Sequence, residues 1–180
     1  MLVHKGSIAL ETDRLVLRRY ADDDYRMMYN NWASDPEVTQ YLTWDTHTDI
    51  EVTKALVHEW AQTYASSTVY HWGITLGDEL IGDISVVKWS EVHEWCEIGY
   101  CLCRRHWGCG IMTEALRAVI RYLFDEIGFH RVQLRHDSQN IASGRVLEKA
   151  GLTYEGAMKA ASRRKDGTWA DIILYGKINA

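Results

Sequence analysis

Residues 104–115 combine residue types that could bind an anionic group. They read Arg-Arg-His-Trp-Gly-Cys-Gly-Ile-Met-Thr-Glu-Ala, so two arginines and two glycines directly precede an amphipathic helix. Glycine at such a junction adopts backbone angles that other residues avoid, and it adds no side chain. Backbone N–H groups of the loop and of the first helical turn can then converge on a phosphate, with roughly half a positive charge from the helix dipole. We therefore interpret the segment as a pyrophosphate-binding loop.

Two well-known glycine loops share the order strand, loop and helix, and both fit this chain poorly. A P-loop requires Lys followed by Ser or Thr, and no Lys follows Gly110. The dinucleotide fingerprint requires a third glycine at the position that Thr113 occupies. A plain strand-to-helix turn is the remaining alternative, because short glycine motifs are weak signals.

The elements that must position this loop are a strand before it and a helix behind it. Residues 94–102 have the composition of a strand. After the loop, apolar residues recur at three- and four-residue steps and end before Gly128, which is typical of an amphipathic helix with a glycine stop. The apolar positions are Met112, Ala115, Leu116, Val119, Ile120, Leu123, Phe124 and Ile127.

The remaining patterns extend this order to the whole chain. They predict further strands at residues 11–19, 70–76, 80–88, 131–135, 153–158 and 170–178. Helices are expected from residue 22 to before the Asp35-Pro36 turn, from a Thr48/Glu51 capping box to residue 64, and from Asn140 to residue 150. The order β-α-α-β-β-β-α-β-α-β-β predicts one α/β domain over residues 1–180 with a mixed sheet.

Composition limits the class of protein. The chain has 180 residues, 47% of them hydrophobic and 25% charged, which is ordinary for a globular domain. It has no apolar run of about 20 residues and no signal-peptide pattern, so we expect a cytoplasmic protein without membrane contact. The net charge of -5 argues against a general nucleic-acid binder and favours cationic partners.

Four cysteines lie close together in the sequence, at Cys96, Cys101, Cys103 and Cys109. Their spacings match no common zinc pattern. We therefore favour small buried thiols over metal ligands and expect no metal site, with Cys109, in the loop beside the anion site, as the exception.

The element order, with a glycine loop after the fourth strand, resembles the GCN5-related N-acetyltransferase (GNAT) superfamily. Within it, the chain is similar to the branch of the ribosomal-protein alanine N-acetyltransferases RimJ and RimL. Residues 105–110 match the superfamily signature Gln/Arg-x-x-Gly-x-Gly/Ala. The other stretches that carry the resemblance are residues 11–18, 72–74, 80–84, 97–100, 140–143, 148–152 and 155–156.

The resemblance implies a mixed, mostly antiparallel sheet of about seven strands, splayed at the cofactor site, with about four helices. It also implies acetyl-CoA as the donor, an amine as the acceptor and no metal. The pyrophosphate would lie on the loop, the pantetheine arm along the strand at residues 100–102, and Asn140 would bind that arm. Residues expected to contact the cofactor are Tyr100, Cys101, Leu102, Arg105, His106, Trp107, Gly108, Cys109, Gly110, Ile111, Met112, Thr113, Asn140 and Ser143.

Direct attack of an amine on the thioester, in a ternary complex, needs a proton acceptor and a proton donor, because an ammonium has a pKa of about 10. We take Ser143 as the candidate acid, with an ordinary first-turn helix serine as its alternative. Glu97 is the candidate base, with a structural ion pair as its alternative. Glu94 and His93 are held in reserve.

The acceptor is the least constrained part of the prediction. Ser162 stands near a position where some members of the branch carry an acidic residue, so their substrate cannot simply be transferred. A protein N-terminus, a polyamine, an amino sugar or an amine antibiotic would each fit, and a homodimer stays open. The alternatives to an acetyltransferase are a non-catalytic coenzyme A sensor and, less well supported, a nucleotide- or phosphate-binding protein.

Overall fold

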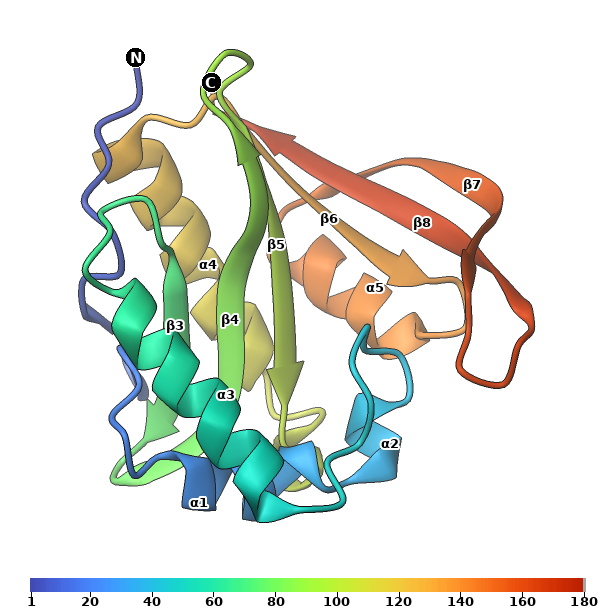
Figure 1. Cartoon of the computed structure of the whole chain (residues 1–180). Coiled ribbons are helices and arrows are strands. Elements are labelled where there is room, and N and C mark those ends of the chain that lie inside the picture. The colour runs from blue at the N-terminus through green and yellow to red at the C-terminus, as the bar shows by residue number, and fades with distance from the viewer. Residues whose placement is uncertain (180) are drawn as a thin grey trace.

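The computed structural model describes residues 1–179, which form one eight-stranded sheet with helices on both faces (Figure 1). The strand order is β1-β2-β3-β4-β5-β6-β8-β7. The strands are β1 (Leu10–Glu11), β2 (Leu15–Arg18), β3 (His71–Leu76), β4 (Glu79–Ser90), β5 (Trp95–Leu102), β6 (Arg131–Asp137), β7 (Thr153–Arg163) and β8 (Trp169–Ile178). The helices are α1 (Tyr25–Met28), α2 (Pro36–Thr39), α3 (Ile50–Thr63), α4 (Ile111–Tyr122) and α5 (Ile141–Lys149).

The sheet opens between β5 and β6, its one parallel pair. These two strands pair only at Trp95, Cys96 and Glu97, whereas β5 continues to Leu102 beside β4. Beyond Glu97, the edge of β5 that faces β6 has no strand partner within residues 1–179. The predicted mixed, mostly antiparallel and splayed sheet is therefore confirmed.

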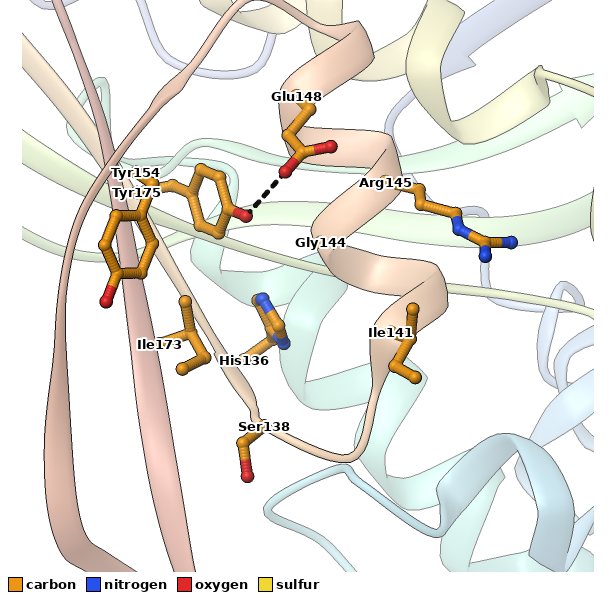
Figure 2. Close-up of a pocket in the computed structure, with 9 residues that line it drawn as sticks. All are labelled: His136, Ser138, Ile141, Gly144, Arg145, Glu148, Tyr154, Ile173 and Tyr175. Carbon is orange, nitrogen blue, oxygen red and sulfur yellow. Dashed lines mark hydrogen bonds between the residues drawn. The ribbon is translucent and has the colours of Figure 1, made fainter.

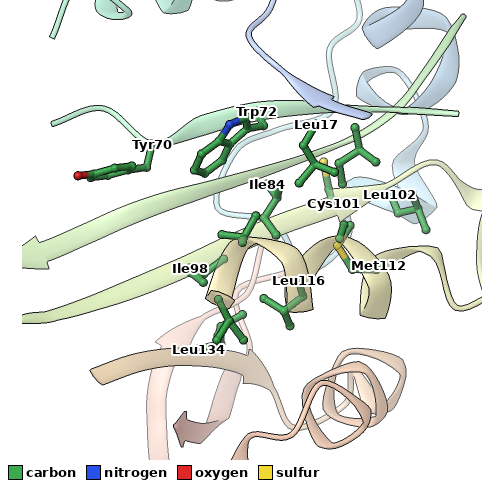
Figure 3. Packing of buried hydrophobic residues seen from close by; sticks show 14 of the residues in the cluster. Leu17, Tyr70, Trp72, Ile84, Ile98, Cys101, Leu102, Met112, Leu116 and Leu134 are labelled. Atoms are coloured by element: carbon green, nitrogen blue, oxygen red, sulfur yellow. The ribbon is translucent and has the colours of Figure 1, made fainter. Parts of the chain in front are cut away.

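Helix α4 packs its predicted apolar face into the core. Figure 3 shows Met112 and Leu116 of α4 beside Ile98 of β5 and Leu134 of β6. All eight predicted apolar positions of the helix are buried. The helix passes through a π-helical turn and ends at Gly128, whose φ of +90° is the left-handed conformation that glycine favours.

The two faces of the sheet are covered unequally. Helices α4 and α5 lie on one face, α1 and α3 lie over β3 and β4 on the other, and α2 lies beyond the end of β5 (Figure 1). On the face that carries α1 and α3, no helix covers β6 and β8, so Arg135 of β6 is exposed there. No helix within residues 1–179 is both long and apolar enough to cross a membrane.

Several element boundaries differ from the sequence-based prediction. The first predicted strand is a hairpin of two strands, because Thr12 Oγ1 accepts from the N–H of Leu15 at 3.0 Å and turns the chain. This raises the strand number to eight. Strand β7 runs on to Arg163, because a bulge near Ala160 absorbs the residues that were expected to leave the sheet.

Two helix starts also differ. Helix α2 forms between the first two predicted helices, where no helix was expected. The Asp35 side chain accepts from the Glu37 N–H at 2.9 Å, and the first turn of a helix tolerates proline. The predicted Thr48/Glu51 capping box is wrong. Asp49 caps α3 by accepting from the Glu51 N–H at 3.0 Å, since aspartate is a strong N-cap residue.

Candidate active site

The glycine loop presents a row of free backbone donors. Gly108 and Gly110 have φ values of +75° and +76°, and Gly110 is the N-cap of α4. Within the described chain, the N–H groups of residues 108–113 have no hydrogen-bond partner. Six consecutive donors at the positive end of a helix dipole form an anion site. A Cβ built on Gly108 would meet nothing within 4 Å, so the loop is open on that side.

In the first turn of α4, only the backbone can bind an anion. The side chains of Ile111, Met112 and Thr113 are buried in the protein. The predicted contacts of these residues are therefore restricted to their N–H groups.

A clamp from the β1–β2 hairpin holds the loop against α4. Arg14 pairs with Glu114 at 2.6 Å, and its Nη1 donates to the carbonyl of Cys109 at 3.1 Å. Thr12 Oγ1 donates to Glu114 at 2.6 Å. Desolvation by burial raises the pKa of Glu114, but hydrogen bonds from Thr12 and Arg14 outweigh it, so the pKa is lowered. Sequence reasoning missed this clamp.

The arginines of the loop already have acidic partners. Arg104 contacts Asp35 at 3.1 Å and Glu37 at 2.6 Å, and Arg105 pairs with Glu79. All of these pairs are partly exposed and therefore weak. Either arginine could turn to a phosphate at small energetic cost.

The other loop side chains differ in what they offer. Trp107 is 46% exposed, and its Nε1 donates to the carbonyl of Leu102 at 2.8 Å. The Nε2 atom of His106 is buried and has no partner within residues 1–179. Cys109 is an exposed thiol, whereas Cys96, Cys101 and Cys103 are buried, as predicted for small core thiols.

The open edge of β5 lies beside the start of α5. Tyr100 is half-buried on β5, and its hydroxyl lies 2.8 Å from Ser143 Oγ. Burial raises the pKa of Tyr100 to about 12, against a smaller lowering effect of the hydrogen bond with Ser143. The phenol is therefore protonated at neutral pH and able to donate.

Asn140 caps α5 as predicted. Its Oδ1 accepts from the Ser143 N–H at 3.2 Å. Its Nδ2 has no partner among the described residues and can still bind a ligand. The cap and the tyrosine together fix the orientation of Ser143.

Glu97 lies at the last paired position before β5 and β6 separate. Its side chain is 9% exposed, and its two oxygens accept from Arg135 Nε at 2.8 Å and Gln133 Nε2 at 3.1 Å. Side chains alternate along a strand, so Glu97 and Tyr100 point to opposite faces of the sheet. The ion pair that was the alternative role of Glu97 is present.

The reserve residues lie elsewhere. Glu94 and His93 are in the turn before β5, about 20 Å from Tyr100 by the rise of the strand. Glu94 pairs there with the Met1 amino group at 2.9 Å. Within the described chain, His, Cys, Asp and Glu form no group of three that could hold a metal ion.

Free backbone amides beside an unpaired strand edge, in a splayed α/β sheet, form a site with donors for an anion and an open edge for an extended chain. The family model described as "Acetyltransferase (GNAT) domain" matches residues 14–153, and the chain belongs to this family. The predicted family, fold and enzyme class are therefore confirmed, and the protein is an acetyl-CoA-dependent N-acetyltransferase.

Three relatives show how far the similarity extends. The uncharacterized N-acetyltransferase YoaA of Bacillus subtilis is 34% identical over 168 residues, covering 92% of this chain and 94% of that protein. The ribosomal protein uS5-alanine N-acetyltransferase of Escherichia coli is 27% identical, covering 93% and 89%. The solved structure of RimL, the ribosomal L7/L12 alpha-N-protein acetyltransferase, in complex with coenzyme A has a TM-score of 0.86 at 22% identity, covering 95% and 98%. At that identity, the last likeness shows the fold alone.

Proposed function

We propose that this enzyme binds acetyl-CoA between the glycine loop and the open edge of β5 and acetylates a protein N-terminus by direct transfer. The observation that carries the proposal is the row of six free N–H groups that leads to the edge of β5 where Tyr100 meets Ser143. A diphosphate fits the first feature, and a peptide-like arm fits the second.

Each residue then has a defined task. The N–H groups of residues 108–113 hold the diphosphate, and Asn140 Nδ2 binds the arm. Acetyl-CoA, when bound, supplies the activated acetyl group. The acceptor amine uses its lone pair to form the new C–N bond as the C–S bond breaks, and a β5 N–H polarises the carbonyl. Ser143 Oγ donates its proton to the departing sulfur and regains one through Tyr100 or solvent.

The acceptor approaches from the opposite face. Glu97 points to that face, so it is the candidate for taking the amine proton while Ser143 acts on the other side of β5. Arg135 and Gln133 already donate to the Glu97 carboxylate, an arrangement that also suits a structural role.

A protein N-terminus is favoured by the relatives and by the uncovered face of β6. The uS5-alanine enzyme acts on a protein amine, and 93% of this chain aligns with it. The β7–β8 turn borders the acceptor side, because Lys165 donates to the carbonyls of Thr39 at 2.9 Å and Trp44 at 2.5 Å. An open face beside this border can accept an extended peptide.

A panel of acceptors tests the proposal through thiol release. It contains peptides that begin with Ala or Ser, the same peptides with a blocked N-terminus, a polyamine and an amino sugar. We expect release only with the free peptides. Release with a small amine alone would overturn the assignment of a protein N-terminus as the acceptor. Binding of acetyl-CoA without thiol release would favour the non-catalytic coenzyme A sensor. The single domain, the cytoplasmic location and the homodimer are still predictions. Cell fractionation tests the location, and sedimentation tests the oligomeric state.

A further inference from the structure

A cavity of about 400 Å³ lies between α5 and the strands β6, β8 and β7 (Figure 2). No residue of the glycine loop lines it, and neither does Ser143. Ile141, Gly144 and Glu148 recur at helical spacing along the α5 wall, whereas Ser143 is turned about 100° away from Gly144. The cavity is therefore a second concave site, on another flank of the helix.

The first polar group of this cavity is a hydrogen-bond acceptor. His136 Nδ1 lies 2.7 Å from the carbonyl of Asp137, and only an N–H can bond to a carbonyl. In the neutral ring, Nε2 therefore carries a lone pair. Nε2 is buried and has no partner among the described residues. It lies against α5, because a Cβ on Gly144 would be 3.1 Å away.

The second polar group is an anion. Glu148 Oε1 accepts from the Tyr175 hydroxyl at 3.0 Å, and its Oε2 has no partner within residues 1–179. Burial raises the pKa of Tyr175, and the hydrogen bond and the charge of Glu148 raise it further. The Tyr175 phenol therefore keeps its proton and donates it to the Glu148 carboxylate at the cavity.

Aromatic rings form the third feature. Tyr154 stands edge-on to Tyr175 with centroids 5.9 Å apart, and His136 lies 5.8 Å from Tyr175. Tyr154 is 56% exposed, so a ring face is open to a ligand. Arg145 also borders the cavity, but Figure 2 shows its guanidinium on the side of α5 away from the tyrosines.

We propose that this cavity binds an organic cation that carries N–H donors, an alkylguanidinium or a primary alkylammonium. The cation would donate to His136 Nε2 and pair with Glu148, and its charge would lie near the tyrosine rings. Ile141 and Ile173 give the alkyl chain an apolar wall. A neutral or anionic ligand would leave the carboxylate without a counter-charge.

The test compares two probes of the same shape. n-Butylguanidine is a cation without a free primary amine, so it is a poor acetyl acceptor, and n-butylurea is its uncharged counterpart. Each is titrated at pH 8 into the full chain while the His136 ring nitrogens are followed by NMR. We expect the guanidine to move the Nε2 signal and to bind at least about tenfold more tightly than the urea.

A matched pair of variants locates the site. Glu148→Gln, in which Tyr175 keeps an acceptor, should weaken binding of the guanidine about tenfold. Glu59→Gln removes one carboxylate from the exposed side of α3 and should leave binding unchanged. Equal binding of both probes, no response of His136 up to 50 mM (about a thousandfold above a 50 µM site), or equal effects of the two variants would overturn the proposal. Unfolding midpoints of both variants should match the wild type.

Discussion

The Tyr100 hydroxyl lies 2.8 Å from Ser143 Oγ, although the two residues are 43 positions apart. The contact spans the opening that forms where β5 and β6 stop pairing. It therefore orients the serine across the space assigned to the thioester. A hydroxyl that is held in this way can donate a proton without first reorganising.

Removing this hydroxyl pair should slow chemistry rather than binding. Ser143→Ala is expected to lower kcat about a hundredfold at saturating acetyl-CoA, which is a typical effect of losing a general acid. Tyr100→Phe should cost several-fold, because it no longer orients Ser143 while solvent can still return the proton to the serine, and the double variant should be no slower than Ser143→Ala. Ser162→Ala, on an exposed part of β7, is the control. Unchanged rates in Ser143→Ala would remove it from the mechanism.

The free energy of unfolding should fall at alkaline pH, because the buried tyrosines keep their protons to a higher pH than the tyrosines of the unfolded chain. Burial raises the pKa values of Tyr64, Tyr100 and Tyr122 from 10 to about 12. The folded state therefore holds protons that the unfolded state loses, so this stability is present below pH 10 and is lost as pH rises to 12. Each group contributes a slope of about 1.4 kcal/mol per pH unit in that window.

Urea unfolding from pH 8 to pH 11 tests this, with a flat region below pH 10 and the slope above it. Tyr100→Phe should reduce the slope by roughly 1 kcal/mol per pH unit. Tyr154→Phe removes an exposed phenol and should leave the slope unchanged. Equal slopes in the wild type and Tyr100→Phe would contradict the assignment.

Gly108→Val should weaken coenzyme A binding at least about tenfold, because a branched side chain would occupy the space that the diphosphate needs. Gly77→Val is a matched control, since Gly77 also has a positive φ, +59°, but lies in the β3–β4 turn. Both variants should lose about 1–2 kcal/mol of stability from backbone strain. Calorimetry should then show weaker binding in Gly108→Val alone.

Glu114→Gln should loosen the clamp on the glycine loop. The pair with Arg14 is partly exposed, so we expect a loss of about 0.5–1 kcal/mol at pH 7 and a few-fold weaker affinity for coenzyme A. The pKa of Glu114 is lowered in the folded state, so its contribution is present above pH 4.5 and is lost as pH falls below it. The difference from the wild type should therefore shrink in acid. Glu126→Gln, which breaks the exposed pair with Lys5, should not change the affinity.

Local patterns were enough to predict the helix of residues 111–127 and the glycine loop. The amphipathic period determines the first, and the need for a positive φ determines the second. The Asn140 cap is also a local contact, within one helical turn. Such features depend on neighbours in the sequence, so the sequence alone contains them.

The contacts that complete the site were not predictable in this way. The Arg14–Glu114 clamp joins residues 100 positions apart, and the pair of Tyr100 and Ser143 depends on where β5 and β6 part. The two strands of the first hairpin, β1 and β2, are too short to show an alternating pattern of their own. Strand register and tertiary packing determine these features, and no periodic pattern in a single sequence predicts them.

Glu97→Gln separates the two roles of the most ambiguous site residue. If the carboxylate accepts the amine proton, Glu97→Gln should lower kcat, most strongly at low pH, where the acceptor is an ammonium. If Glu97 only pairs with Arg135, the variant should lose stability and keep its rate. Because β5 and β6 part at this residue, both effects could occur together, and a second variant is needed.

Arg135→Gln provides that comparison, because it breaks the 2.8 Å pair and keeps the carboxylate. The base role predicts that Arg135→Gln stays active while Glu97→Gln slows at least about tenfold. An indirect effect of the ion pair predicts equal losses in both. Rates at saturating acetyl-CoA from pH 6 to 9, with unfolding free energies for each variant, decide between them. A Glu97→Gln enzyme with the wild-type rate at every pH would leave proton removal to water, since solvent can then take the ammonium proton before attack.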